Sequence, residues 1–124
     1  AIAKRKATAE KYREALKDVP GVRCLQDIEG VRHNYAYFPI FISDEYGISR
    51  DALYAKLQEH NIYGRRYFYP LISTFSAYKG LESADPKNLP IAHKLADQVL
   101  CLPMFAGLDN ESTDKIIDIV IHKK

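Results

Sequence analysis

Cysteine is scarce in this chain of 124 residues: Cys24 and Cys101 are the two present, far apart and without a C-x-x-C spacing. Their scarcity excludes a disulfide-rich framework and favours free thiols in a cytoplasmic protein. No apolar run approaches the roughly 20 residues that a membrane-spanning helix needs. The first residues also lack the apolar stretch of a secretory signal. We therefore expect a cytoplasmic location and no membrane partner.

An excess of charge of one sign is also lacking. The chain has 18 Lys and Arg against 16 Asp and Glu, a net charge of +2, so binding to nucleic acid is not expected from charge. At 47% hydrophobic and 27% charged residues, the composition is that of a globular protein. A chain of this length can bury one core, which predicts a single domain over 1–124.

The motifs of several chemistries are missing. There is no glycine-rich phosphate loop before a helix and no Gly-x-Ser-x-Gly nucleophile turn. The four histidines match no metal-ligand spacing, so no metal site is expected. From the residues alone, the chain offers no complete catalytic site.

Hydrophobic spacing and capping residues predict four helices. Four side chains of the first, over 2–17, fall near one face: Ala3, Ala7, Tyr12 and Leu16. Ser49 suits the N-cap of the second, which should stop near residue 60. Pro90 suits the start of the third, and Asp109 suits the cap of the last.

Short strands are predicted at 22–25, 34–42 and 99–102, with a further strand or extended segment over 62–69. The 34–42 segment is rich in aromatic and β-branched residues on both parities, so both of its faces should be covered. Pro39 cannot donate a ladder hydrogen bond, which predicts an edge strand or a bulge there. The order of elements predicts an α+β fold, a small antiparallel or mixed sheet with helices mainly on one side.

The segment 64–71 is the candidate binding segment. Its two guanidiniums, beside tyrosines, suit bidentate binding of phosphate and stacking on a ring. The alternative is a strand whose aromatic side chains pack in the core while the arginines stay solvated. The segment 34–38 has the same two interpretations, and the residues alone leave both open.

Six segments occur in an order and spacing that is specific only in combination: 11–16, 20–22, 34–40, 62–71, 92–103 and 108–109. Together they resemble the C-terminal region of the DegT/StrS family, the pyridoxal 5'-phosphate-dependent sugar-nucleotide aminotransferases. The resemblance covers nearly the whole chain. The chain also opens inside a helical pattern without Met, which predicts a piece of a larger protein.

The resemblance implies the small C-terminal domain of a fold type I aminotransferase, with 1–20 as an interdomain helix region and 21–124 as the small domain. A large N-terminal domain would hold pyridoxal 5'-phosphate on a lysine, and a homodimer would complete the site. The reaction would move an amino group, usually from glutamate, to a keto group of a nucleotide-linked sugar. No catalytic or cofactor-binding residue is expected in this segment, which should be inactive alone.

The resemblance also implies substrate contacts. Arg65 matches the arginine of the family's Arg-Tyr-Pro-Leu block, and Tyr67 and Tyr69 match the aromatic positions after it. Arg65 would meet a substrate phosphate or carboxylate, while the two tyrosines shape the sugar pocket. Asn34 and Tyr35 are further candidates for the same cleft.

One position departs from the pattern. Many members have a histidine where this chain has Ile72, which puts a histidine contact to substrate in doubt.

A rival hypothesis is a non-enzymatic RNA-binding module that uses Arg65, Tyr67 and Tyr69. Aromatic strands beside arginines on a small sheet can stack bases. The low net charge and the absence of the usual glycine spacing count against it.

Overall fold

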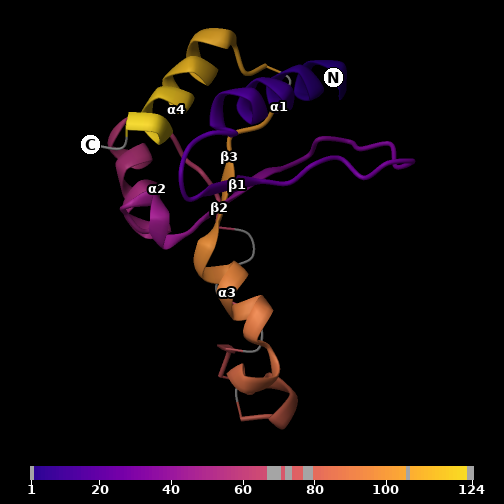
Figure 1. The fold of residues 1–124 in the computed structure, drawn as a ribbon, viewed down its shortest axis with the longest axis vertical. Helices are drawn as coiled ribbons and strands as arrows, with labels where there is room; N and C mark the ends of the chain where they lie inside the picture. The colour runs from indigo at the N-terminus through magenta and orange to yellow at the C-terminus, as the bar shows by residue number, and fades with distance from the viewer. Residues whose placement is uncertain (1, 67–70, 72–73, 77–79, 106, 123–124) are drawn as a thin grey trace.

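The computed structural model describes residues 2–66, 71, 74–76, 80–105 and 107–122 (Figure 1). Its elements are four helices, α1 (Ile2–Leu16), α2 (Arg50–Glu59), α3 (Pro90–Gln98) and α4 (Asn110–His122), and three strands, β1 (Val22–Cys24), β2 (Phe38–Ile42) and β3 (Val99–Leu102). Short 3₁₀ turns lie at Asp44–Tyr46, Glu82–Ala84 and Pro86–Asn88.

The sheet is antiparallel, in the order β1-β2-β3. Side chains of β2 and β3 alternate between two faces. One face packs in the main core against α1, α2 and α4, and its strand members are Phe38, Ile40, Ile42, Leu100 and Leu102. The other face meets α3, which runs directly into β3 (Figure 1). The predicted α+β fold, with helices mainly on one side, is confirmed.

The capping predictions are confirmed for two helices. The hydroxyl of Ser49 accepts a hydrogen bond from the Ala52 amide at 3.1 Å, which satisfies an orphan donor at the start of α2. The carboxylate of Asp109 accepts from the Ser112 amide at 2.7 Å at the start of α4. Hydrogen bonds from Ser112 lower the pKa of Asp109, as expected for an anion at a helix N-terminus.

The predicted inner face of the first helix is wrong in part. Tyr12 and Leu16 are fully buried, but the third buried residue of α1 is Ala9, while Ala3 and Ala7 are exposed. Ala9 lies three residues before Tyr12 and therefore near it on the helix. Ala7 lies five residues before it, about 140° around the helix axis.

Pro39 lies in β2, the central strand of the sheet, but β2 is an edge at this position, as predicted, because β1 pairs with it only from Ile40 onward. Pro39 pairs with Cys101, whose amide and carbonyl both bond to Arg65 on the far side of β3. The Pro39–Cys101 pair is therefore not hydrogen-bonded, and the nitrogen of Pro39 faces β1. On the β1 side, the residue that would pair with Pro39 follows Cys24, the last residue of β1. No strand is there to accept a hydrogen bond from Pro39, so its missing N–H costs the ladder nothing.

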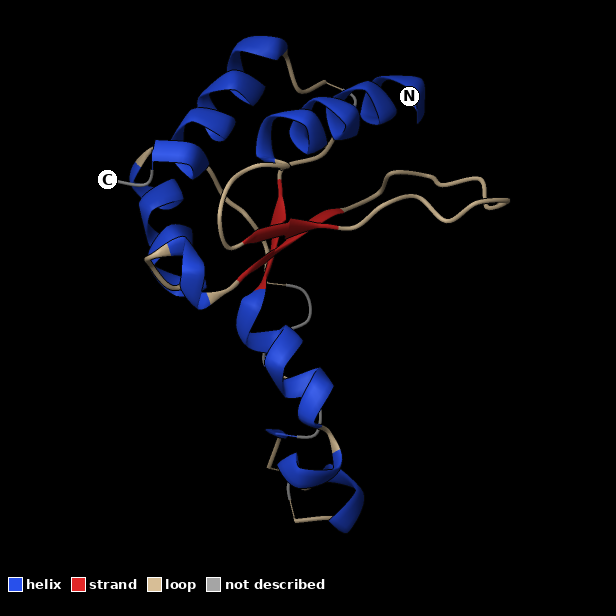
Figure 2. Cartoon of the chain, in the orientation of Figure 1, coloured by secondary structure: helices blue, strands red, loops and turns tan. Residues whose placement is uncertain are grey.

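Residues 25–37 connect β1 to β2 as an arm that projects beyond the helices (Figure 2). The strand predicted from residue 34 is therefore observed only from Phe38. Tyr35 interrupts the extended backbone because its φ of 54° lies in the left-handed region. The arm carries exposed apolar side chains at Leu25, Ile28 and Val31.

Both cysteines are free thiols, Cys24 half-buried and Cys101 buried. Burial raises the pKa of Cys24, and the nearby charge of Arg13 opposes this only in part. Within the described ranges, no helix has both the length and the apolar character that crossing a membrane requires.

Candidate functional site

Arg65 lies beside the sheet, next to β3. Its amide donates to the Cys101 carbonyl at 3.0 Å, and the Cys101 amide donates to the Arg65 carbonyl at 2.6 Å, an isolated antiparallel bridge. Gly64 permits this approach, since a Cβ there would lie 3.0 Å from Cδ1 of Leu100 and 3.2 Å from the Cys101 carbonyl oxygen. The extended segment predicted over 62–69 is thus observed up to Arg66; the remainder of it lies outside the described residues.

The pairing also fixes which face Arg65 occupies. Directly paired residues of antiparallel strands share a face, so Pro39, Cys101 and Arg65 form a row on the face that meets α3. Beside that row is an apolar groove, whose lining includes Tyr37, Pro39, Phe41, Leu95, Val99 and Cys101. Arg65 is exposed, and its guanidinium makes no hydrogen bond or ion pair with the described residues. An apolar groove beside an available cation suits a ligand with a ring and an anionic group.

Arg66 is turned to the opposite face and has a different environment. Its Nη1 donates to Oδ1 of Asp51 at 3.1 Å, and its guanidinium lies 4.7 Å from the ring centroid of Tyr54. The sequence placed the two arginines together as possible phosphate ligands. The period-2 alternation of an extended segment separates them.

Asp51 forms ion pairs with two arginines, Arg50 and Arg66. Its Oδ1 also accepts from Nε of Arg50 at 2.8 Å. Partial burial opposes ionisation of Asp51, but the hydrogen bonds and charges of Arg50 and Arg66 outweigh it and hold the pKa of that carboxyl below its usual range.

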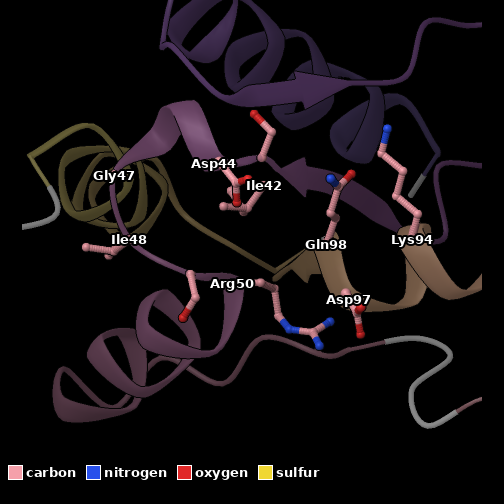
Figure 3. A pocket seen from close by; sticks show the side chains of 10 residues that line it. Ile42, Asp44, Gly47, Ile48, Arg50, Lys94, Asp97 and Gln98 are labelled. Atoms are coloured by element: carbon pink, nitrogen blue, oxygen red, sulfur yellow. The ribbon is translucent and has the colours of Figure 1, made fainter.

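Arg50 was not singled out from the sequence. Its side chain is 2% exposed and points from the start of α2 toward the end of α3, where Asp97 and Gln98 lie (Figure 3). Nη1 donates to the carbonyl oxygens of Ala96 at 2.7 Å and Val99 at 2.8 Å. It therefore caps the C-terminal end of α3, where carbonyls lack partners within the helix and a cation is favourable. No local pattern in the sequence signals this role.

Tyr35 lies at the base of the arm, in a pocket distinct from the apolar groove, although Tyr37 and Pro39 line both. It is 6% exposed, and its hydroxyl donates to Asp27 at 2.6 Å. Asp27 in turn accepts from Arg13 at 2.8 Å. The hydrogen bond from Arg13, followed by that from Tyr35, lowers the pKa of Asp27, and the same bond to Asp27 raises the pKa of Tyr35.

Asn34 is exposed next to Tyr35 and lines the same pocket. Its side-chain oxygen accepts from the Ala36 amide at 3.0 Å. Its carbonyl accepts two hydrogen bonds from Arg5, at 3.0 and 3.2 Å. The polar groups of Asn34 and Tyr35 thus hold the arm against α1. Their assignment as substrate contacts stays a prediction, as does that of Tyr67 and Tyr69, which lie outside the described residues with Ile72.

Comparison with known proteins identifies the family to which this chain belongs. The model of the DegT/DnrJ/EryC1/StrS aminotransferase family matches residues 1–121. The chain belongs to this family. The resemblance inferred from the six segments is confirmed.

Relatives in the DegT/DnrJ/EryC1/StrS family include a dTDP-4-amino-4,6-dideoxy-D-glucose transaminase of Escherichia coli, 45% identical over 122 residues, which are 98% of this chain and 33% of the relative. A GDP-perosamine synthase of Vibrio cholerae is 27% identical over 112 residues, 90% of this chain and 29% of the relative. The chain therefore spans about a third of the length of the relatives it matches.

Solved structures of the family share the fold. A DegT DnrJ EryC1 StrS aminotransferase from Brucella abortus matches with a TM-score of 0.79 and 33% identity, over 96% of this chain and 30% of that one. DesI, crystallised in the presence of its TDP-sugar product, matches with a TM-score of 0.88 and 27% identity, over 98% of this chain and 31% of that one.

The family implies pyridoxal 5'-phosphate, which such enzymes hold on a lysine. The described residues do not fit a site for this cofactor. Their lysines are exposed or half-buried on helices and turns, and two of them are already in ion pairs, Lys11 with Asp114 at 2.7 Å and Lys17 with Glu14 at 2.9 Å. No group of His, Cys, Asp or Glu in the described part of the chain is arranged to hold a metal ion.

Proposed function

We propose that this chain is the C-terminal small domain of a pyridoxal 5'-phosphate-dependent aminotransferase that acts on a dTDP-linked keto sugar. Residues 1–20 form the interdomain helix region and 21–124 the small domain of a longer, cytoplasmic protein. Family membership and the name of the Escherichia coli relative, 45% identical, support this assignment. That name, a 4-amino-4,6-dideoxyglucose transaminase, favours a keto group at C4 as the acceptor.

In the proposed reaction glutamate gives up its amino group and becomes 2-oxoglutarate, and the sugar ketone becomes an amine. The cofactor, when bound, supplies the electron sink for this exchange. The lysine that carries it would lie in the missing part of the protein, and the intact enzyme would be a homodimer. Residues 1–124 alone would then be inactive.

We expect borohydride reduction of the intact protein, followed by mass spectrometric peptide mapping, to give one pyridoxyl-lysine outside residues 1–124. Reduction fixes the imine between the cofactor and its lysine as a stable amine, so the position is read directly. Residues 1–124 expressed alone and treated in the same way serve as the control and should give no single modified lysine. An intact protein without a modified lysine would contradict the proposal, and salt-sensitive binding of single-stranded RNA would then be the next assay.

Arg65 is the residue of this domain that we assign to the substrate. The observation that carries the assignment is its place beside the apolar groove, with a guanidinium that no described residue engages. In contact with the diphosphate of the sugar nucleotide, it would form charge-assisted hydrogen bonds. Tyr67 and Tyr69 would shape the sugar pocket, and Asn34 and Tyr35 would contact the substrate from the adjoining pocket at the base of the arm.

We expect Arg65→Ala in the intact enzyme to weaken binding of thymidine 5'-diphosphate at least about tenfold, because hydrogen bonds to charged groups contribute roughly 1.5–3 kcal/mol each. KM for the nucleotide sugar should rise in parallel. Isothermal titration calorimetry measures the binding change. Arg32→Ala, on the exposed arm, is the matched control and should bind like the wild type. An unchanged dissociation constant for Arg65→Ala would contradict the assignment.

A further inference from the structure

The segment that carries Arg65 begins at Ile62, whose amide donates to the Leu57 carbonyl of α2 at 2.9 Å, and beyond that residue it is attached to the domain at two described points of different kinds. The first is the backbone bridge between Arg65 and Cys101. The second is the side chain of Arg66, held by Asp51 at 3.1 Å and by the ring of Tyr54 at 4.7 Å. One bridge fixes the position of a strand but allows it to pivot. A second attachment on the adjacent residue, from the opposite face, fixes its twist and hence the direction of the Arg65 side chain.

Asp51 is itself held in place. The same Oδ1 that accepts from Arg66 accepts from Arg50, and Arg50 is buried and bonded to the carbonyls of Ala96 and Val99. Val99 begins β3, the strand to which Arg65 is paired. The network therefore connects the Arg65 segment back to its own neighbouring strand by a route through the start of α2.

We propose that Asp51 is a positioning residue for the substrate site, acting on Arg65 through Arg66; this inference rests on the proposed function of Arg65. The ion pair between Arg66 and Asp51 has exposed fractions of 34% and 60%, and such pairs contribute little to stability. Its role is to hold geometry, because a cation displaced by even a small distance loses bidentate contact with a phosphate.

The test is a double-mutant cycle in the intact enzyme, with the dissociation constant of thymidine 5'-diphosphate as the readout. Asp51→Asn removes the anion at almost constant volume. We expect it to weaken binding about three- to tenfold when Arg65 is present and less than about 1.5-fold in the Arg65→Ala background, because coupled residues give non-additive effects. Asp51→Glu keeps the carboxylate and should restore binding to within about twofold of the wild type.

Asp114→Asn is the matched control. It breaks an ion pair with Lys11, 2.7 Å long and similarly exposed, between α1 and α4. It should leave binding unchanged and melt within about 3 °C of the wild type. Asp51→Asn also removes the anion beside the buried Arg50, so it should melt at a lower temperature than Asp114→Asn while staying folded at the assay temperature.

Each outcome is decisive. If Asp51→Asn binds like the wild type, if it weakens binding equally with and without Arg65, or if Asp51→Glu fails to restore a loss, the positioning role is overturned. Binding by the single variant Arg65→Ala tests the proposed substrate role of Arg65 independently of Asp51. A loss in Arg65→Ala without a loss in Asp51→Asn would leave the function standing and remove only the role of Asp51.

Discussion

Replacing Gly21 by alanine should destabilise this domain by about 4 kcal/mol or more, a large part of the 5–15 kcal/mol that holds a typical domain folded. Gly21 has a φ of 79°, in the left-handed region where glycine is favoured. An added Cβ would lie 2.2 Å from the Tyr46 nitrogen and 2.7 Å from the Tyr46 Cα, so the clash is with backbone.

The neighbouring chain cannot withdraw easily. Tyr46 is fully buried, and its hydroxyl donates to the Val120 carbonyl of α4. Burial raises the pKa of Tyr46 to about 12, so this hydroxyl remains a donor at all ordinary pH values. The Gly21 carbonyl accepts from the Ser43 amide at 2.8 Å, which holds the two segments together.

Gly30→Ala provides a matched control for this prediction. Gly30 has nearly the same φ, 80°, but no atom lies within 4 Å of the position of its Cβ. Gly30→Ala should therefore lower the free energy of unfolding only by the cost of the left-handed backbone, about 1 kcal/mol. Urea unfolding followed by circular dichroism measures both variants. Equal losses at the two glycines would show that the contact with Tyr46 adds nothing.

Arg50→Ala should also destabilise the domain strongly, lowering the free energy of unfolding by about 2–4 kcal/mol. The substitution removes the donor to two carbonyl oxygens, those of Ala96 and Val99, and leaves them without that partner inside the protein. It also removes a cation from the C-terminal end of α3, where the helix dipole favours one. Arg50→Lys should recover only part of the loss, because one ammonium group cannot replace both Nη1, which donates to the two carbonyls, and Nε, which donates to Asp51.

The same unfolding measurement tests this prediction. Arg32→Ala removes an arginine from the exposed arm and should change stability by less than about 0.5 kcal/mol. If Arg50→Ala were as mild as Arg32→Ala, the carbonyls of Ala96 and Val99 would have found other partners, and Arg50 would not hold α3 in place.

Local chemistry was sufficient to predict much of the fold. The caps at Ser49 and Asp109 act within one turn of helix, so the residues that begin α2 and α4 are visible in the sequence. The strand at 99–102 is a short apolar run before a proline, and it is observed with the same bounds. The order of the six segments was sufficient to predict the family, although no single segment was.

Other features depend on which strands become neighbours. The missing hydrogen-bond donor of Pro39 predicted an edge at that position, but the sequence does not show that the edge arises inside a central strand, where β1 ends before it reaches Pro39. Residues 34–37 looked like a continuation of β2, yet Tyr35 bonds to Asp27 at the base of the arm instead of pairing in the sheet. In both cases a partner outside the segment itself, or its absence, decided the outcome.

The sequence by itself determined the α+β class, the helix starts and the family, and the resemblance to the family singled out Arg65 as a substrate contact, which stays a prediction. Only the tertiary structure showed that Arg65 and Arg66 face opposite sides, and that Asp51 and Arg50 hold Arg66 in place. The physical reason is the range of the interactions. Capping and strand propensity act over a few residues, whereas an arginine's role depends on what lies across the sheet, and for Arg50 those acceptors are 46 and 49 residues away.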